Sequence, residues 1–176
     1  MVPERDIVLR PRVAGEIIFR AADFTPGGFV EKSQVLVEID PADYRNALRR
    51  QQSRVDQALS DLRLEMGQQH IARQDYESLG RELSQENKAL VLREPQLEAA
   101  RAVVADARAA LDQARLDLAR TEVSAPFDAQ VLGRDVDVGS QVAAGDSLGR
   151  LVGTEMFWVA ATVPLVVGLH IFQPGA

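Results

Sequence analysis

The chain of 176 residues contains no cysteine, two histidines and two lysines. Without cysteine it has no disulfide framework, no thiolate nucleophile and no zinc–sulfur site. The histidines, His70 and His170, have no nucleophile or carboxylate constellation beside them in the sequence. The three methionines are scattered rather than clustered. We therefore expect no catalytic residues, no metal site and no cofactor.

Basic residues are outnumbered, with 20 Lys and Arg against 26 Asp and Glu, for a net charge of −6 at pH 7. Because nucleic-acid-binding domains usually carry a basic face, we expect no nucleic-acid partner. No phosphate-binding glycine motif is present.

Long apolar runs are missing too. The longest uncharged stretch, 157–172, is shorter than the roughly 20 residues that span a bilayer, and Pro164 interrupts it.

Glycine and proline are nearly absent from the middle of the chain. Residues 42–122 contain only Gly67, Gly80 and Pro95, whereas the flanks are rich in both residue types. This division predicts a helical middle between flanks of strand and loop. We expect an antiparallel hairpin of two helices with its tip near residues 80–84. Each arm has about 38 residues and is roughly 57 Å long.

The helical middle carries a seven-residue apolar repeat of the kind that forms a coiled-coil seam. In the second arm, 85–122, the repeat consists of Leu97, Val104, Leu111 and Leu118, with the small residues Ala100, Ala107, Ala114 and Thr121 three positions later. In the first arm, 43–80, it consists of Leu48, Val55, Leu62, Gln69 and Tyr76, with Leu59 and Met66 alongside, and Leu83 continues it into the tip. A parallel dimer of one long helix is the alternative. Pro95 disfavours it, because proline kinks a helix or begins a new one after Glu94.

The two flanks repeat one motif. Residues 27–36 and 139–148 share a glycine turn, a valine, two spacers, a small residue, a polar residue and a leucine, and 11–17 corresponds to 125–131. Such self-similarity indicates a single β-unit split by the helices, since neither half has enough apolar residues for its own core. We expect strands at 16–19, 35–39, 130–132 and 148–152, and structural turns at Gly15, Gly27, Gly28, Gly139 and Gly145.

The paired half-motifs resemble the biotinyl/lipoyl fold. With the segment Thr121-Glu122-Val123-Ser124-Ala125-Pro126-Phe127-Asp128, their order is similar to the periplasmic adaptor (membrane fusion protein) family of bacterial tripartite efflux pumps. The stretch 92–97 is similar to a sequence common in RND-type adaptors. Ser33 and Ala129 stand where the family usually has glycine.

This resemblance implies an α+β fold: a long antiparallel α-helical coiled-coil hairpin inserted into a lipoyl-like β-domain, with the start of a further β-barrel domain. The implied domains are 8–41 with 123–153 for the β-domain, 42–122 for the hairpin and 154–176 for the truncated barrel.

The resemblance also implies a function and partners. The family's adaptors are periplasmic, oligomerise (commonly as hexamers) and join an inner-membrane transporter to an outer-membrane TolC-type channel. The segment that would associate this protein with the inner membrane is expected outside the chain. The family's tip carries an arginine, a leucine four residues on and a serine seven further. Arg73 and Ser84 have that spacing, while Glu77 takes the leucine place and Leu83 lies nearby, so we expect Arg73, Leu83 and Ser84 to bind the partner.

We reject a cofactor carrier from the sequence, whereas two other interpretations remain open. A cofactor carrier needs a lysine on the exposed turn between its halves, yet the corresponding turn, 39–43, has none, and Lys32 is expected to be a solvated side chain. An adaptor of an ABC-type exporter or of type I secretion shares the same plan. A coiled-coil scaffold without a transport role would leave the split motif unexplained.

The acid pair Asp135 and Asp137 is expected to serve solubility or to protect a strand edge.

Overall fold

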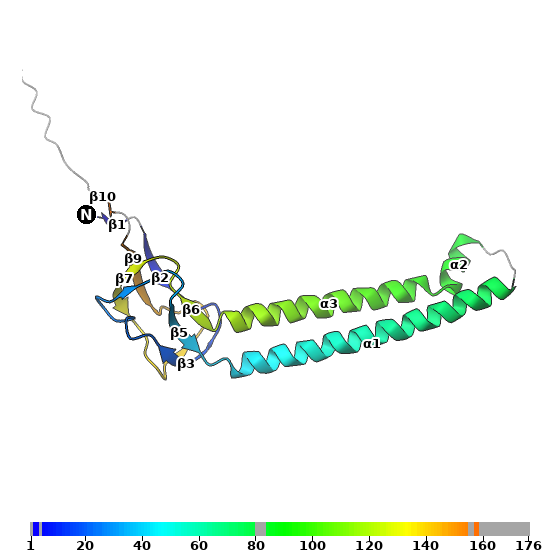
Figure 1. Ribbon diagram of the computed structural model, residues 1–176, viewed down its shortest axis with the longest axis horizontal. Coiled ribbons are helices and arrows are strands. Elements are labelled where there is room, and N and C mark those ends of the chain that lie inside the picture. The colour runs from blue at the N-terminus through cyan, green and yellow to red at the C-terminus, as the bar shows by residue number, and fades with distance from the viewer. Residues whose placement is uncertain (1, 4, 80–83, 155–156, 159–176) are drawn as a thin grey trace, which may run out of the picture.

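The computed structural model describes residues 2–3, 5–79, 84–154 and 157–158. A pair of long helices projects from a small β-unit to which both flanks of the chain contribute (Figure 1). The predicted α+β class, an antiparallel helical hairpin on a lipoyl-like β-unit, is confirmed. Most of 154–176, where the start of a β-barrel domain was expected, lies outside the described residues, as does Leu83.

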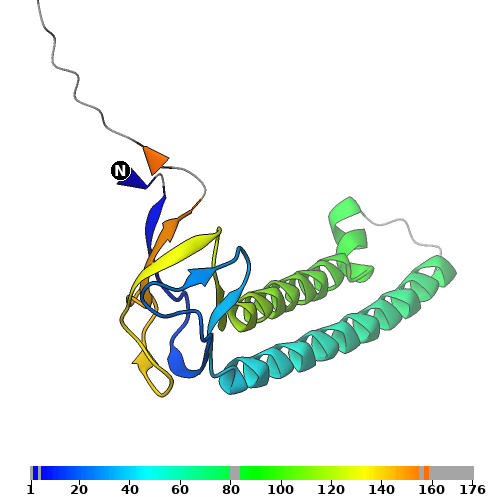
Figure 2. The same cartoon turned by 60° about the vertical axis from the view of Figure 1, so that its left-hand side comes forward.

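The hairpin consists of three helices: α1 (Ala42–Leu79), α2 (Gln85–Val91) and α3 (Glu94–Ala119). The second arm is therefore broken just before Pro95, where the sequence predicted a kink or the start of a new helix. Pro95 lies in the first turn of α3, a position that tolerates its missing amide hydrogen. At the distal end α2 turns away from the axis of α3 (Figures 1 and 2).

The end of α3 differs from the expected end of the arm at residue 122. The Thr121 hydroxyl donates to the Leu118 carbonyl oxygen at 2.7 Å, and the Thr121 carbonyl oxygen accepts the Ile39 amide at 2.8 Å. This second bond belongs to the sheet, so the chain leaves the helix at Ala119 and enters strand β6 at Glu122. Thr121, expected in the seam, is buried at this junction instead.

The seam between α1 and α3 is an apolar stripe along the facing sides of the two helices. Leu97, Val104 and Leu111 of α3 are buried, while Leu118 is only partly buried. The packed cluster consists of Val55, Ala58, Val104, Ala107 and Leu111, with Leu48, Leu59 and Leu62 against it. Small Ala58 and Ala107 let the helices approach closely. Met66 is 51% exposed, so the expectation that it runs along the seam is wrong.

Two four-stranded antiparallel sheets form the β-unit, and each mixes strands from both flanks of the chain. The first sheet has the order β2-β9-β7-β4, with β2 (Asp6–Leu9), β9 (Gly149–Gly153), β7 (Ala129–Arg134) and β4 (Phe29–Val30). The second has the order β6-β5-β3-β8, with β6 (Glu122–Ser124), β5 (Val35–Ile39), β3 (Gly15–Arg20) and β8 (Gln141–Val142). A separate pair joins β1 (Val2–Pro3) and β10 (Phe157–Trp158).

The repeat seen in the sequence is a repeat in the hydrogen bonds. The Gly27 amide donates to the Val131 carbonyl oxygen, and the Gly139 amide donates to the Ile17 carbonyl oxygen, both at 2.8 Å. Ile17 and Val131 correspond in the two halves, and both are fully buried in the shared core. Leu36 and Leu148, the leucines that close the two motifs, are fully buried there as well. Each half therefore supplies the same kind of residue to one interior.

The turns require special backbone geometry or space. Gly15, Gly27, Gly139 and Gly145 have positive φ. At Gly28 the constraint is space, because a Cβ would lie 2.1 Å from the Asp23 carbonyl oxygen. Ser33, which corresponds to Gly145, has the left-handed φ of 67°. The turn therefore keeps the glycine geometry although a serine occupies it.

Shortening a seam residue should loosen the hairpin. Leu111→Ala is expected to lower the free energy of unfolding by about 2–5 kcal/mol, because Leu111 is 5% exposed and its removal leaves a cavity. Leu116→Ala is the matched control, since Leu116 lies on the same helix and is 52% exposed. Urea denaturation monitored by circular dichroism measures both. Equal effects of the two substitutions would show that the seam is assigned to the wrong face.

Removing the strained side chain should stabilise the first half-motif. Ser33→Gly is expected to raise the free energy of unfolding by about 1 kcal/mol, because glycine adopts the left-handed conformation without a Cβ penalty. Thermal unfolding measures the change. The reciprocal substitution Gly145→Ser is the control and should destabilise the protein, because Gly145 has a φ of 93°. Nothing lies within 4 Å of the added Cβ, so the loss would come from the backbone conformation and not from a steric clash. Loss of stability in Ser33→Gly would contradict this account.

Candidate functional site

The distal end of the hairpin holds a shallow hollow between α1 and α2. It has a volume of about 280 Å³ and is lined by Arg73, Tyr76, Glu77, Lys88 and Leu92. The Lys88 Nζ atom lies 5.6 Å from the centre of the Tyr76 ring, within the range of a cation–π contact. The hollow thus combines an aromatic ring with charges of both signs. Such a surface suits recognition of another protein's polar groups.

The structure brings together only part of the expected partner-binding set. Arg73 is exposed and lines the hollow, as does Glu77, which stands in the leucine place of the family motif. Ser84 is exposed and immediately precedes α2, where its carbonyl oxygen accepts the Lys88 amide at 2.9 Å. Ser84 is not a lining residue of the hollow. Leu83 lies outside the described residues.

An ion pair fixes the break between α2 and α3 against α1. The Arg93 Nε and Nη2 atoms donate to Glu65 Oε1 and Oε2 at 2.7 and 2.9 Å, a two-pronged geometry that holds the guanidinium in a defined orientation. Arg93 has a φ of 55°, a left-handed conformation that costs a non-glycine residue about 1–2 kcal/mol. The hydrogen bond from Arg93 is the main reason that the pKa of Glu65 is held below its usual value.

Sequence reasoning did not identify this pair. The two residues are 28 positions apart, and as charged residues they do not stand out in an apolar seven-residue repeat, although Arg93 lies seven residues before Ala100. Pro95 was the available signal, because a proline near the start of a helix implies a helix end just before it. That signal locates the break. It does not say which residue of α1 lies against it.

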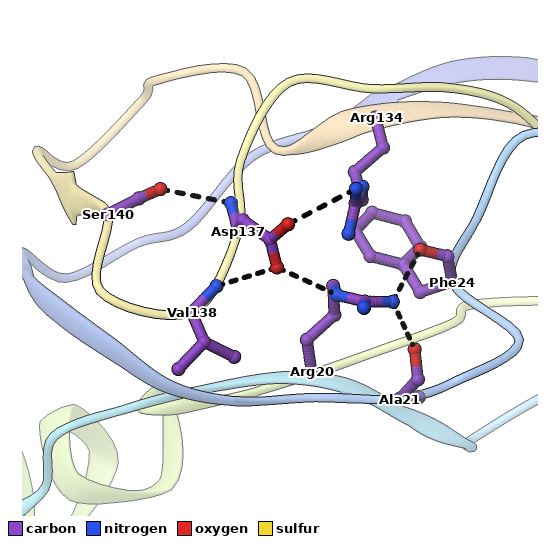
Figure 3. A network of polar contacts seen from close by, with 7 residues as sticks. All are labelled: Arg20, Ala21, Phe24, Arg134, Asp137, Val138 and Ser140. Atoms are coloured by element: carbon purple, nitrogen blue, oxygen red, sulfur yellow. Dashed lines mark hydrogen bonds and ion pairs between the residues drawn. The ribbon is translucent and has the colours of Figure 1, made fainter.

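A second polar network ties the two halves of the β-unit together (Figure 3). Asp137 accepts from the Val138 amide at 2.9 Å and from Arg20 Nε at 3.1 Å, and its other oxygen lies 3.3 Å from Arg134 Nη2. Arg20 comes from the first half of the chain and Asp137 from the second. The role expected for Asp137, solubility or protection of a strand edge, therefore requires correction: this carboxylate joins the half-motifs.

The Asp137 carboxylate is held in its ionised form. The amide of Val138, and after it the guanidinium of Arg20, lower the pKa of Asp137 below its usual value. Asp135 accepts a hydrogen bond from the Ser147 hydroxyl. Both aspartates therefore organise the loops around them.

The described residues offer little to a metal ion. No group of three or more His, Asp or Glu side chains among them is arranged to hold one. His70 is exposed on α1, and His170 lies outside the described part. Over the same described residues, none of the helices is both long and apolar enough to cross a membrane.

Comparison with known families and proteins gives a consistent match. Residues 5–154 match the family model described as the RND MFP barrel-sandwich hybrid domain. The chain is similar to multidrug resistance protein MdtA of Cronobacter turicensis, with 31% identity over 156 residues that cover 85% of this chain and 34% of that protein. Against MdtA of Escherichia coli K12 the identity is 32% over 153 residues, with 85% and 34% covered. The chain spans about a third of the length of these relatives.

Solved structures share the fold. A MacA–MexA chimeric protein containing the Pseudomonas aeruginosa MexA α-hairpin domain has a TM-score of 0.60 and 20% identity, covering 86% of this chain and 49% of that chain. The periplasmic adaptor protein EmrA has a TM-score of 0.62 and 15% identity, covering 86% of this chain and 72% of that chain. At these identities the likeness concerns the fold alone.

The contribution of Asp137 to stability should depend on pH. An aspartate whose pKa is lowered by folding stabilises the protein above its unfolded pKa of about 3.9, and this stabilisation is lost as the pH falls through the folded pKa. Asp137→Asn should therefore destabilise the protein at neutral pH, and the difference from wild type should shrink below about pH 4. Urea unfolding midpoints across this range measure it. Asp106→Asn, an exposed aspartate of α3, is the control, and an equal loss there would contradict the assignment.

Proposed function

The chain belongs to the RND-type membrane fusion protein family of periplasmic adaptors, and we propose that it serves as the bridging part of an efflux-pump adaptor subunit. In this role it links an inner-membrane transporter to an outer-membrane TolC-type channel. The observation that carries the proposal is the long paired rod mounted on a β-unit made from both flanks of the chain (Figure 1). We infer no enzymatic role.

The dimensions of the rod support bridging. With 38 residues, α1 is about 57 Å long. Strands β5 and β6 pair with each other, so the helices that follow β5 and precede β6 start from adjacent points of one sheet. Because both helices are fixed at the base and packed against each other, the distal end is held at a defined distance from the β-unit. A spacer between two partners needs this property.

The distal end is the part we propose to contact the outer-membrane channel. Arg73 of α1 and Lys88 of α2 supply hydrogen-bond donors at the hollow, and Arg73 can donate to carbonyl or carboxylate groups at the ends of a partner's helices. Ser84 adds an exposed hydroxyl at the start of α2. Together with Leu83 they make up the proposed contact set.

The proposal includes the assembly around the adaptor. We propose a periplasmic location, association with the inner membrane through a segment outside this chain, and a ring of adaptor subunits, six by family resemblance. We also propose the division into a β-domain of 8–41 and 123–153, a hairpin of 42–122 and a following barrel from 154. The small residues Ala58 and Ala107 lie in the seam between α1 and α3, so they account for close packing of the two helices within one subunit and not for contacts between subunits.

The RND assignment is favoured over the related alternatives. The family model that matches residues 5–154 is that of RND-type proteins, and this match supports the RND assignment. A coiled-coil scaffold without a transport role leaves unexplained why the hairpin is inserted into a split β-unit.

Site-specific cross-linking tests the docking proposal. This chain has no cysteine, so once any cysteine elsewhere in the full-length protein is replaced by serine, Arg73→Cys and Ser84→Cys each introduce a single thiol. In the full-length protein, expressed in its parent bacterium and treated with a bifunctional thiol–amine cross-linker, both variants should capture an outer-membrane channel protein. Asn46→Cys is the control, because Asn46 is exposed in the first turns of α1 beside the β-unit. No capture from either distal position, or equal capture from Asn46→Cys, would contradict the proposal.

A further inference from the structure

The seven-residue repeat of the second arm continues across the break between α2 and α3. Leu90 lies seven residues before Leu97, in register with Val104 and Leu111. The three α3 residues are buried in the seam, yet Leu90 is 59% exposed. Its neighbour Val91 is exposed as well. The sequence therefore encodes a seam position on α2 that the observed conformation does not use.

The first arm shows the matching feature. Helix α1 runs without interruption to Leu79, whereas α3 begins at Glu94, whose neighbour Arg93 contacts Glu65. The part of α1 beyond Glu65, about 21 Å long, thus extends past the start of α3. Met66 and Ile71 in this part are exposed. A straight continuation of α3 would run alongside it.

The break itself is strained and held by a specific contact. Arg93 adopts the left-handed conformation that usually belongs to glycine after a helix end, and its amide donates to the Leu90 carbonyl oxygen at 3.1 Å. Its guanidinium makes both hydrogen bonds to Glu65. Glu65 lies on the other arm, so the bent conformation is fastened to α1 by this ion pair.

We propose that Leu92–Arg93 is a two-state hinge: the Glu65–Arg93 ion pair holds α2 bent away, and in the second state α2 and α3 fuse into one helix with Leu90 in the seam. This inference goes beyond the bridging function and does not depend on it.

Opposing features balance the two states. In the bent state Pro95 lies in the first turn of α3, where proline is well tolerated. In the fused helix its ring would crowd the Val91 carbonyl and one backbone hydrogen bond would be lost. Against this, the fused state relieves the left-handed Arg93 and buries Leu90. The ion pair adds to the bent state, which makes Glu65 and Arg93 positioning residues for the distal end.

The hinge changes the surface offered at the distal end. In the bent state Lys88 lies over the Tyr76 ring, and the hollow beside Arg73 is formed by both helices. In the fused state the second arm covers residues 85–119 in one helix of roughly 50 Å, close to the length of α1. Lys88 then moves away from its bent-state position over Tyr76. The two states therefore present different arrangements of Arg73, Tyr76 and Lys88.

Distance measurement between spin labels tests the proposal directly. With any cysteine outside these 176 residues replaced by serine, Asn87→Cys and Ala105→Cys place one label each at exposed positions on α2 and α3. The two α-carbons are about 27 Å apart in a continuous helix, and closer when α2 is bent. Pulsed electron–electron double resonance on the full-length protein reports the population of each distance.

The variants give opposite expectations. Glu65→Gln, Arg93→Ala and Pro95→Ala should each enlarge the population at the longer distance, the first two by removing the ion pair and the third by removing the obstacle to a continuous helix. Adding Leu90→Ala to Arg93→Ala should shift the population back, because it removes the side chain that the fused seam would bury. The charge-swapped pair Glu65→Arg with Arg93→Glu should restore the shorter distance.

Glu98→Gln is the matched control, because it neutralises an exposed carboxylate on α3 away from the break. It should leave the distance distribution unchanged. A single distance, the same in wild type and in all three variants, would overturn the hinge. A shift in Glu98→Gln as large as that in Glu65→Gln would overturn the role of the ion pair.

Discussion

The pairing of β5 with β6 is the constraint on which the rest of the molecule depends. It joins the strand that precedes the helical insert to the strand that follows it, and the Ile39 amide bonds to the Thr121 carbonyl oxygen at 2.8 Å. Both helices must then start side by side, and the loop-closure entropy of the long insert is offset at its base. Once the bases are adjacent, a modest apolar stripe suffices to keep the arms together.

Stabilising contacts thin out from the base toward the distal end. The β-unit has a core of fully buried residues from both half-motifs, and the seam above it has Val55, Val104 and Leu111. Farther along α1, Met66 and Ile71 are exposed. Regions with few buried apolar contacts rearrange at lower free energy than the core. The gradient thus separates a rigid β-unit from a distal end that can rearrange more easily.

The sequence predicts the strands and the buried seam positions, which depend on local patterns. It does not predict the ion pairs that join charged residues far apart in the chain. Strand β5 appears at the expected residues 35–39, and the seven-residue repeat locates buried Leu97, Val104 and Leu111. These follow from apolar periodicity and turn residues. The left-handed Arg93 was not predicted, since arginine favours helix and its ion-pair partner Glu65 is 28 residues away. Asp137 was misjudged likewise, because its partner Arg20 is 117 residues away.

The position of the helical insert explains how a carrier-like β-unit can serve as a mount. The two half-motifs are nearly equivalent, down to paired backbone bonds such as those of Gly27 and Gly139. The turn at 39–43, where a cofactor carrier would place its lysine, instead leads into α1, and the Asp40 side chain accepts the amide of Ala42, the first residue of this helix, at 2.9 Å. The point from which a flexible cofactor arm would swing is therefore occupied by a stiff rod. Any recognition performed by this chain far from the β-unit has to be performed by the rod's distal residues.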